Sequence, residues 1–96
     1  MAYQSTNPFN AEVVANFPEC DAAELESRLK TAAHCYENAW RNTSFAERSA
    51  ILAKAANIMR ERTDEFANLI TIEMGKLIAQ SRGEVQLSAA DRKSVV

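Results

Sequence analysis

The chain has few of the residues that most often carry chemistry or crosslinks. Its 96 residues include two cysteines, Cys20 and Cys35, and one histidine, His34. Two cysteines are too few for a disulfide framework, and these two do not form a Cys-x-x-Cys pair. A single histidine beside a single thiol is also too small a ligand set for a metal ion. The sequence therefore predicts neither a disulfide-stabilised scaffold nor a metal site.

Clustered glycines, a positive net charge and long apolar runs are also missing. Gly75 and Gly83 are isolated, whereas a phosphate-binding loop needs several glycines together after a strand. The formal net charge is −2 and acidic residues alternate with basic ones, so we expect no nucleic-acid partner. No apolar run approaches the roughly 20 residues that cross a bilayer. Because residues 1–9 also lack a signal-peptide pattern, we expect a cytoplasmic protein that does not engage a membrane.

The N-terminal residues have the pattern of a hairpin. In YQSTNPFNAEVVANFPE, β-branched and aromatic residues flank the turn-forming cluster Asn-Pro-Phe-Asn. Proline presets its own φ, and asparagine side chains can bond to the nearby backbone. We predict strands over residues 3–6 and 12–17, the second ended by Pro18. A lone hairpin of two strands is marginal in water, so this one needs a surface to lie on.

Helical periodicity begins after the hairpin. Asp21 with Glu24, and Ser44 with Glu47, have the spacing of a capping box, which predicts two helix starts. Apolar residues then recur at helical spacing. They form three stripes: Leu25, Leu29, Ala32, Ala33, Tyr36 and Trp40; Ile51, Leu52, Ala55, Ile58 and Met59; and Phe66, Leu69 and Ile70.

The end of the third stripe is marked more clearly than its start. Residues 44–74 fit either one helix or two joined near Thr63. Gly75 is predicted to close the helix in the left-handed conformation, with Lys76 meeting the last free carbonyls. A further helix is predicted from Leu77 to at least residue 89, although Gly83 weakens it by about 1 kcal/mol relative to alanine. The expected architecture is a hairpin followed by three or four amphipathic helices.

Both thiols have a structural interpretation that we favour over a catalytic one. His34 and Cys35 are neighbours, but neighbouring side chains on a helix point about 100° apart. The histidine is therefore poorly placed to activate the thiol. Cys20 stands at a helix entrance, where the helix dipole can lower the pKa of a thiol. We interpret both cysteines as structural or incidental.

The carboxylates and the tryptophan also favour structural roles. Glu61, Glu65, Glu73 and Glu84 lack any pattern that marks a general acid or base, and we interpret them as solvated helix faces. Glu73 can also hold the following turn by accepting backbone donors. Trp40, the sole tryptophan, either anchors a binding surface or completes a core, and we favour the core. The residues thus predict packing surfaces and no catalytic, cofactor-binding or metal-binding side chain.

The order of these motifs resembles the N-terminal part of aldehyde dehydrogenases. NPFNAEVVANFP resembles the hairpin that opens family members, and AWRNTSFAERSAILAKAANIMRERTDEFANLITIEMGKLIAQSRGEV is similar to the helices that follow. The resemblance covers residues 3–90 and is nearest to bacterial NAD(P)-dependent succinate-semialdehyde dehydrogenases. Two positions depart from the family: Asn10-Ala11 replaces a common Thr-Gly pair, and Leu77 replaces a proline that often opens the next helix.

The resemblance implies a complete enzyme that is much longer than this chain. That enzyme would have an α/β fold, with NAD or NADP on a Rossmann-type sheet and a cysteine that attacks an aldehyde. Residues 1–90 would be the N-terminal part of the cofactor-binding domain. The nucleophile and the glycine loop lie downstream of the matched part, and neither Cys20 nor Cys35 aligns with that nucleophile. The resemblance thus carries over no site residue, and it implies that this chain alone is inactive and binds no cofactor. It also implies a homo-oligomer, a dimer or a tetramer, that acts on a small-molecule aldehyde.

The last six residues differ from the family, and the chain as a whole has one alternative interpretation. Residues 91–96, DRKSVV, depart abruptly from the family pattern. These residues followed by a stop codon are the translation of a common short-read sequencing adapter, so we hypothesise that the tail is not biological. The alternative to the enzyme interpretation is a small stand-alone helical module that binds a protein partner through its apolar stripes. That alternative requires a self-sufficient core.

Overall fold

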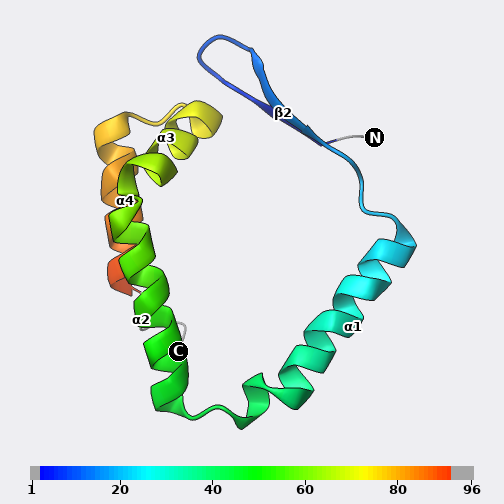
Figure 1. Ribbon diagram of the computed structural model, residues 1–96. Coiled ribbons are helices and arrows are strands. Elements are labelled where there is room, and N and C mark those ends of the chain that lie inside the picture. The colour runs from blue at the N-terminus through cyan, green and yellow to red at the C-terminus, as the bar shows by residue number, and fades with distance from the viewer. Residues whose placement is uncertain (1–2, 92–96) are drawn as a thin grey trace.

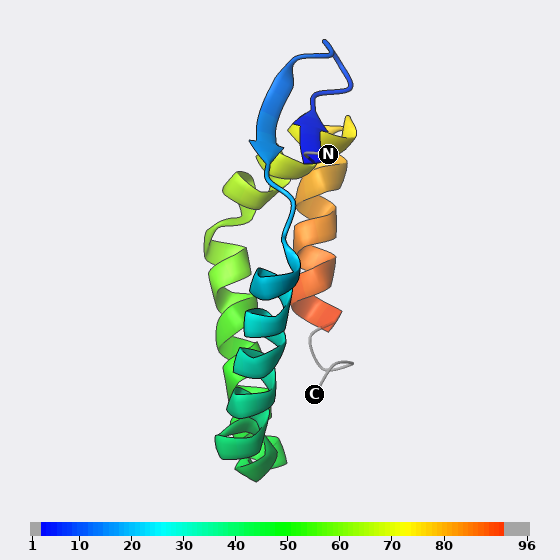
Figure 2. The same ribbon diagram turned by 90° about the vertical axis from the view of Figure 1, so that its right-hand side faces the viewer.

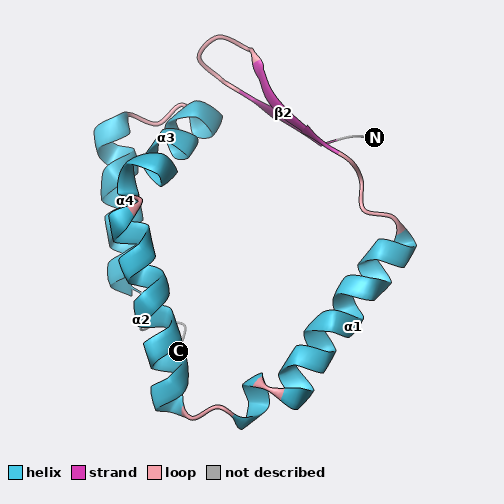
Figure 3. Ribbon diagram, in the orientation of Figure 1, coloured by secondary structure: helices cyan, strands magenta, loops and turns pink. Residues whose placement is uncertain are grey.

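The computed structural model describes residues 3–91 (Figure 1). Its elements are β1 (Tyr3–Thr6), β2 (Val13–Phe17), α1 (Ala22–Asn38), the short 3₁₀ helix η1 (Trp40–Asn42), α2 (Phe45–Glu61), α3 (Thr63–Met74) and α4 (Ile78–Ala90). The predicted hairpin and helices are therefore confirmed (Figure 3). Of the hypothesised non-native tail, residues 91–96, all but Asp91 lie outside the described residues.

The hairpin forms around the predicted Asn-Pro turn. β1 and β2 pair antiparallel, with Tyr3 opposite Phe17. The Asn7 side chain accepts a hydrogen bond from the Phe9 backbone N–H at 3.0 Å. Ala11 has a φ of 61°, a left-handed conformation that glycine adopts at lower cost. The departure from the family's Thr-Gly pair therefore falls on a position whose backbone favours glycine.

Both predicted helix starts are confirmed, but only one has the complete capping box. Ser44 accepts from the Glu47 backbone N–H at 3.1 Å, and the Glu47 carboxylate accepts from the Ser44 N–H at 2.6 Å. Asp21 likewise accepts from the Glu24 N–H at 2.7 Å. The Glu24 side chain does not return the bond to the helix start, because it pairs with Arg28 one turn along α1.

Residues 44–74 form two helices separated at Arg62. Arg62 has φ −106° and ψ 25°, outside helical geometry. Thr63 does not cap α3 with its side chain, since its hydroxyl donates back to the Arg60 carbonyl at 2.7 Å. Gly75 ends α3 at φ 70°, as predicted. The prediction for Lys76 was wrong: its ammonium lies 3.0 Å from the Glu84 carboxylate on α4, which is a stronger partner for a cation than a helix-end carbonyl.

The core lies where α4 packs against α2 and α3, and it is built mainly of small residues. Ala56, Ala67, Val85 and Ala89 are 0–3% exposed. Small side chains let the helix backbones approach closely. Ser81, also buried, satisfies its hydroxyl by a hydrogen bond of 3.0 Å with Thr71 across the α3–α4 contact.

The other half of the segment is open. Figure 1 shows α1 and α2 as separate sides of an open ring, and Figure 2 shows its narrow edge. The Cα radius of gyration is 17.3 Å, against about 12.5 Å for a compact domain of this length. None of the 17 residues of α1 is buried. The described residues therefore lack the self-sufficient core that a stand-alone helical module requires. None of the helices in this range is long and apolar enough to cross a membrane.

Candidate functional site

Neither thiol has an activating base among the described residues: the Glu24 carboxylate lies beside Cys20, but it is already paired with Arg28. Cys20 and Cys35 are free and exposed. The His34 ring, on the helical turn that carries Cys35, lies 3.2 Å from the Asn38 side-chain nitrogen. The Cys20 sulfur lies 3.6 Å from the Asp21 carbonyl oxygen. Within residues 3–91, these contacts do not form the nucleophile and base that a cysteine enzyme needs.

The carboxylates with perturbed pKa values are exposed members of helix caps and ion pairs. A hydrogen bond from Arg28 lowers the pKa of Glu24, and a hydrogen bond from Arg62 lowers the pKa of Glu65. The backbone N–H of Ser44 lowers the pKa of Glu47 in the same way. A lowered pKa makes a carboxylate a weaker base, so these shifts do not favour a role in general acid–base catalysis.

The other glutamates considered in the sequence are paired or exposed. Glu84 pairs with Lys76, and Glu61 is exposed. Glu73 was predicted to accept backbone donors at the turn; instead its carboxylate accepts from the Ser5 hydroxyl at 2.9 Å. This bond ties β1 of the hairpin to the last turn of α3, a contact between residues 68 positions apart.

The two glycines do not form a phosphate-binding loop in the structure, and the possible metal ligands do not form a cluster. A Cβ at Gly75 would lie 3.0 Å from Cγ of Pro8, so Gly75 allows the hairpin turn to approach the end of α3. Gly83 lies inside α4 with open space around it. Among the described residues there is no group of three or more histidine, cysteine or carboxylate side chains that could hold a metal ion.

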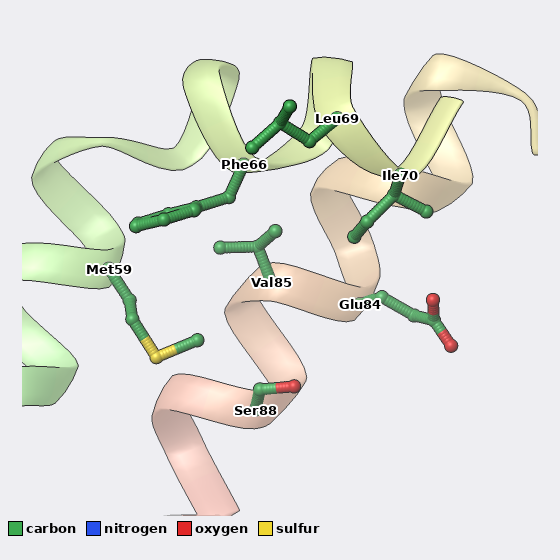
Figure 4. A pocket seen from close by; sticks show the side chains of 7 residues that line it. All are labelled: Met59, Phe66, Leu69, Ile70, Glu84, Val85 and Ser88. Atoms are coloured by element: carbon green, nitrogen blue, oxygen red, sulfur yellow. The ribbon is translucent and has the colours of Figure 1, made fainter. Parts of the chain in front are cut away.

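An open hollow of about 410 Å³ lies among α2, α3 and α4. Figure 4 shows Met59, Phe66 and Val85 directed toward a common space, whereas the Glu84 carboxylate points away. A binding site for a polar substrate needs polar groups that converge on the ligand. Glu84 points away and Ser88 is the one other polar residue among the described residues of the lining, so we interpret the hollow as a packing surface.

Arg48 joins three groups at the corner between α1 and α2, and the sequence analysis missed it. Its guanidinium lies 5.4 Å from the centre of the Trp40 ring, in a cation–π contact. The same group donates to the Thr43 hydroxyl at 2.8 Å and to the Trp40 carbonyl at 3.2 Å. Trp40 is thus half-buried at the corner between α1 and α2, and its predicted place in a core is not found among residues 3–91. The sequence did contain a signal for this contact: Arg48 falls in the first turn of α2, a few residues after the Trp40-Arg41 pair.

The geometry of the described residues does not identify a function, but comparison with known proteins identifies a family. A family model described as "Aldehyde dehydrogenase family" matches residues 1–93. The succinate-semialdehyde dehydrogenase (NADP+) of Deinococcus radiodurans is 42% identical over 88 residues, which cover 92% of this chain and 18% of that protein. The enzyme of the same name from Escherichia coli K12 is 34% identical over 89 residues, covering 93% of this chain and 18% of the relative.

A solved structure shows the same fold within a larger chain. The structure of Gox0499, reported for its cofactor and substrate selection, matches with a TM-score of 0.90 at 29% identity. That match covers 94% of this chain and 20% of the larger one. This chain therefore spans about a fifth of the length of the relatives it matches.

The hairpin and helices correspond to the N-terminal fifth of much larger dehydrogenases. The chain belongs to the aldehyde dehydrogenase family. The resemblance found in residues 3–90 is thereby confirmed, as is the description of the segment as a hairpin followed by helices.

Proposed function

We propose that residues 1–90 are the N-terminal part of the cofactor-binding domain of an NADP-dependent aldehyde dehydrogenase. The complete enzyme would oxidise an aldehyde to the carboxylic acid, and succinate semialdehyde is the proposed substrate. The observation that carries this proposal is the family match over residues 1–93, together with the shared name of the relatives from Deinococcus radiodurans and Escherichia coli. Sequence reasoning left NAD and NADP open, and those names favour NADP.

The described residues do not fit a dinucleotide. Gly75 and Gly83 are separated in the structure, one at a helix end and one inside α4. The hollow between the helices is lined mainly by apolar side chains. We therefore assign no chemical step and no cofactor contact to this segment, and we propose that it contributes packing surfaces to the complete enzyme.

The exposed apolar side chains support this packing role. Val13, Phe17, Ile51, Phe45 and Leu87 are each at least half exposed. Exposed apolar side chains on several elements favour contact with further protein surface, which supports a packing role. The proposal also includes a cytoplasmic location and a homo-oligomer, a dimer or a tetramer, both carried from the sequence interpretation.

The proposal is tested on the complete reading frame that contains this segment. The purified protein would be mixed with succinate semialdehyde and either NADP or NAD, and formation of the reduced cofactor would be followed by absorbance. We expect faster reduction of NADP than of NAD, and none with the chain of residues 1–96 as a control. Reduction of NAD alone would correct the cofactor assignment. Absence of reduction with succinate semialdehyde would overturn the substrate, and absence with a panel of aldehydes would overturn the activity.

A further inference from the structure

We draw no further inference here: the strongest candidate, the open hollow between the β1–β2 hairpin and the end of α3 that the exposed side chains of Tyr3, Phe17 and Met74 line, carries nothing, because nothing in the structure shows what covers it.

Discussion

Two helices of equal length, α1 and α2, differ in how far they pack against the rest of this segment. Each has 17 residues and an apolar stripe, and each begins with a side-chain cap. α2 buries Ala56 against α4, whereas α1 buries none of its residues. The difference lies in the turns that come after the two helices. The chain turns at Arg62 and Gly75, and these turns bring α3 and α4 back against α2. The corner between α1 and α2, which Arg48 holds, instead leads α2 away from α1. An amphipathic stripe thus predicts that a face is covered, without saying that the cover lies in the same segment.

The largest expected effect comes from placing a charge in the packed half. Val85 is 3% exposed and faces Met59 and Phe66 across the hollow. Val85→Asp would bury a carboxylate without a partner there. We expect the free energy of unfolding of the complete protein to fall by about 3–5 kcal/mol. Urea denaturation monitored by circular dichroism measures this change.

The control for that substitution is the next residue along α4. Gln86 is exposed, and Gln86→Asp should change the free energy of unfolding by less than about 0.5 kcal/mol. A similar loss of stability for both variants would mean that Val85 is no more buried in the complete protein than Gln86. The contrast between the two halves would then disappear.

Substituting alanine for each glycine should change stability by a smaller amount, with opposite signs at Gly75 and Gly83. The pair tests how the hairpin contacts the packed half. Gly75 has φ 70° and leaves room for Pro8, so Gly75→Ala should destabilise the complete protein by about 1–2 kcal/mol. Gly83 lies inside α4 with open space around it, so Gly83→Ala should stabilise it by about 0.5–1 kcal/mol. Thermal unfolding of both variants measures the pair of shifts. Stabilisation by Gly75→Ala would contradict the close contact between the hairpin and α3.

The smallest expected effect is a dependence on pH at the start of α2, where the open half meets the packed half. The Ser44 backbone N–H lowers the folded pKa of Glu47 below its ordinary value of 4.5. Its contribution to stability is therefore complete above that value and is lost as the pH falls through the folded pKa. Because Glu47 is exposed, the loss is small. Glu47→Gln should show a shallower decline of stability between neutral and acidic pH, and an unchanged slope would contradict the capping role.

The features predicted correctly from the sequence are those decided by nearby residues. The Asn-Pro hairpin turn, the caps at Asp21 and Ser44, and the helix end at Gly75 each depend on side chains within about three positions. The boundary between α2 and α3 was left open, because Thr63 is equally compatible with a cap or a helix interior. Its hydroxyl bonds back into α2, and the break falls one residue earlier.

The features that the sequence predicted incorrectly depend on distant parts of the chain. Glu73 meets Ser5 across 68 positions, and Lys76 meets Glu84 on the following helix. Periodicity places a residue on a face without naming the element opposite. For the same reason Trp40 was assigned to a core, whereas it lies under Arg48 at a corner. The absence of site residues in this segment stays a prediction, and the family itself was recognisable from the order of local motifs.

The most direct test of the central claim is long-read sequencing of the source DNA past the codon for Ala90. The account predicts that the reading frame continues into a much longer protein with a glycine loop and a downstream cysteine, and that the codons for residues 91–96 are replaced. A genomic stop codon directly after Val96 would contradict it. The chain would then end without an active site, and the exposed stripe of α1 would need a partner from outside the polypeptide.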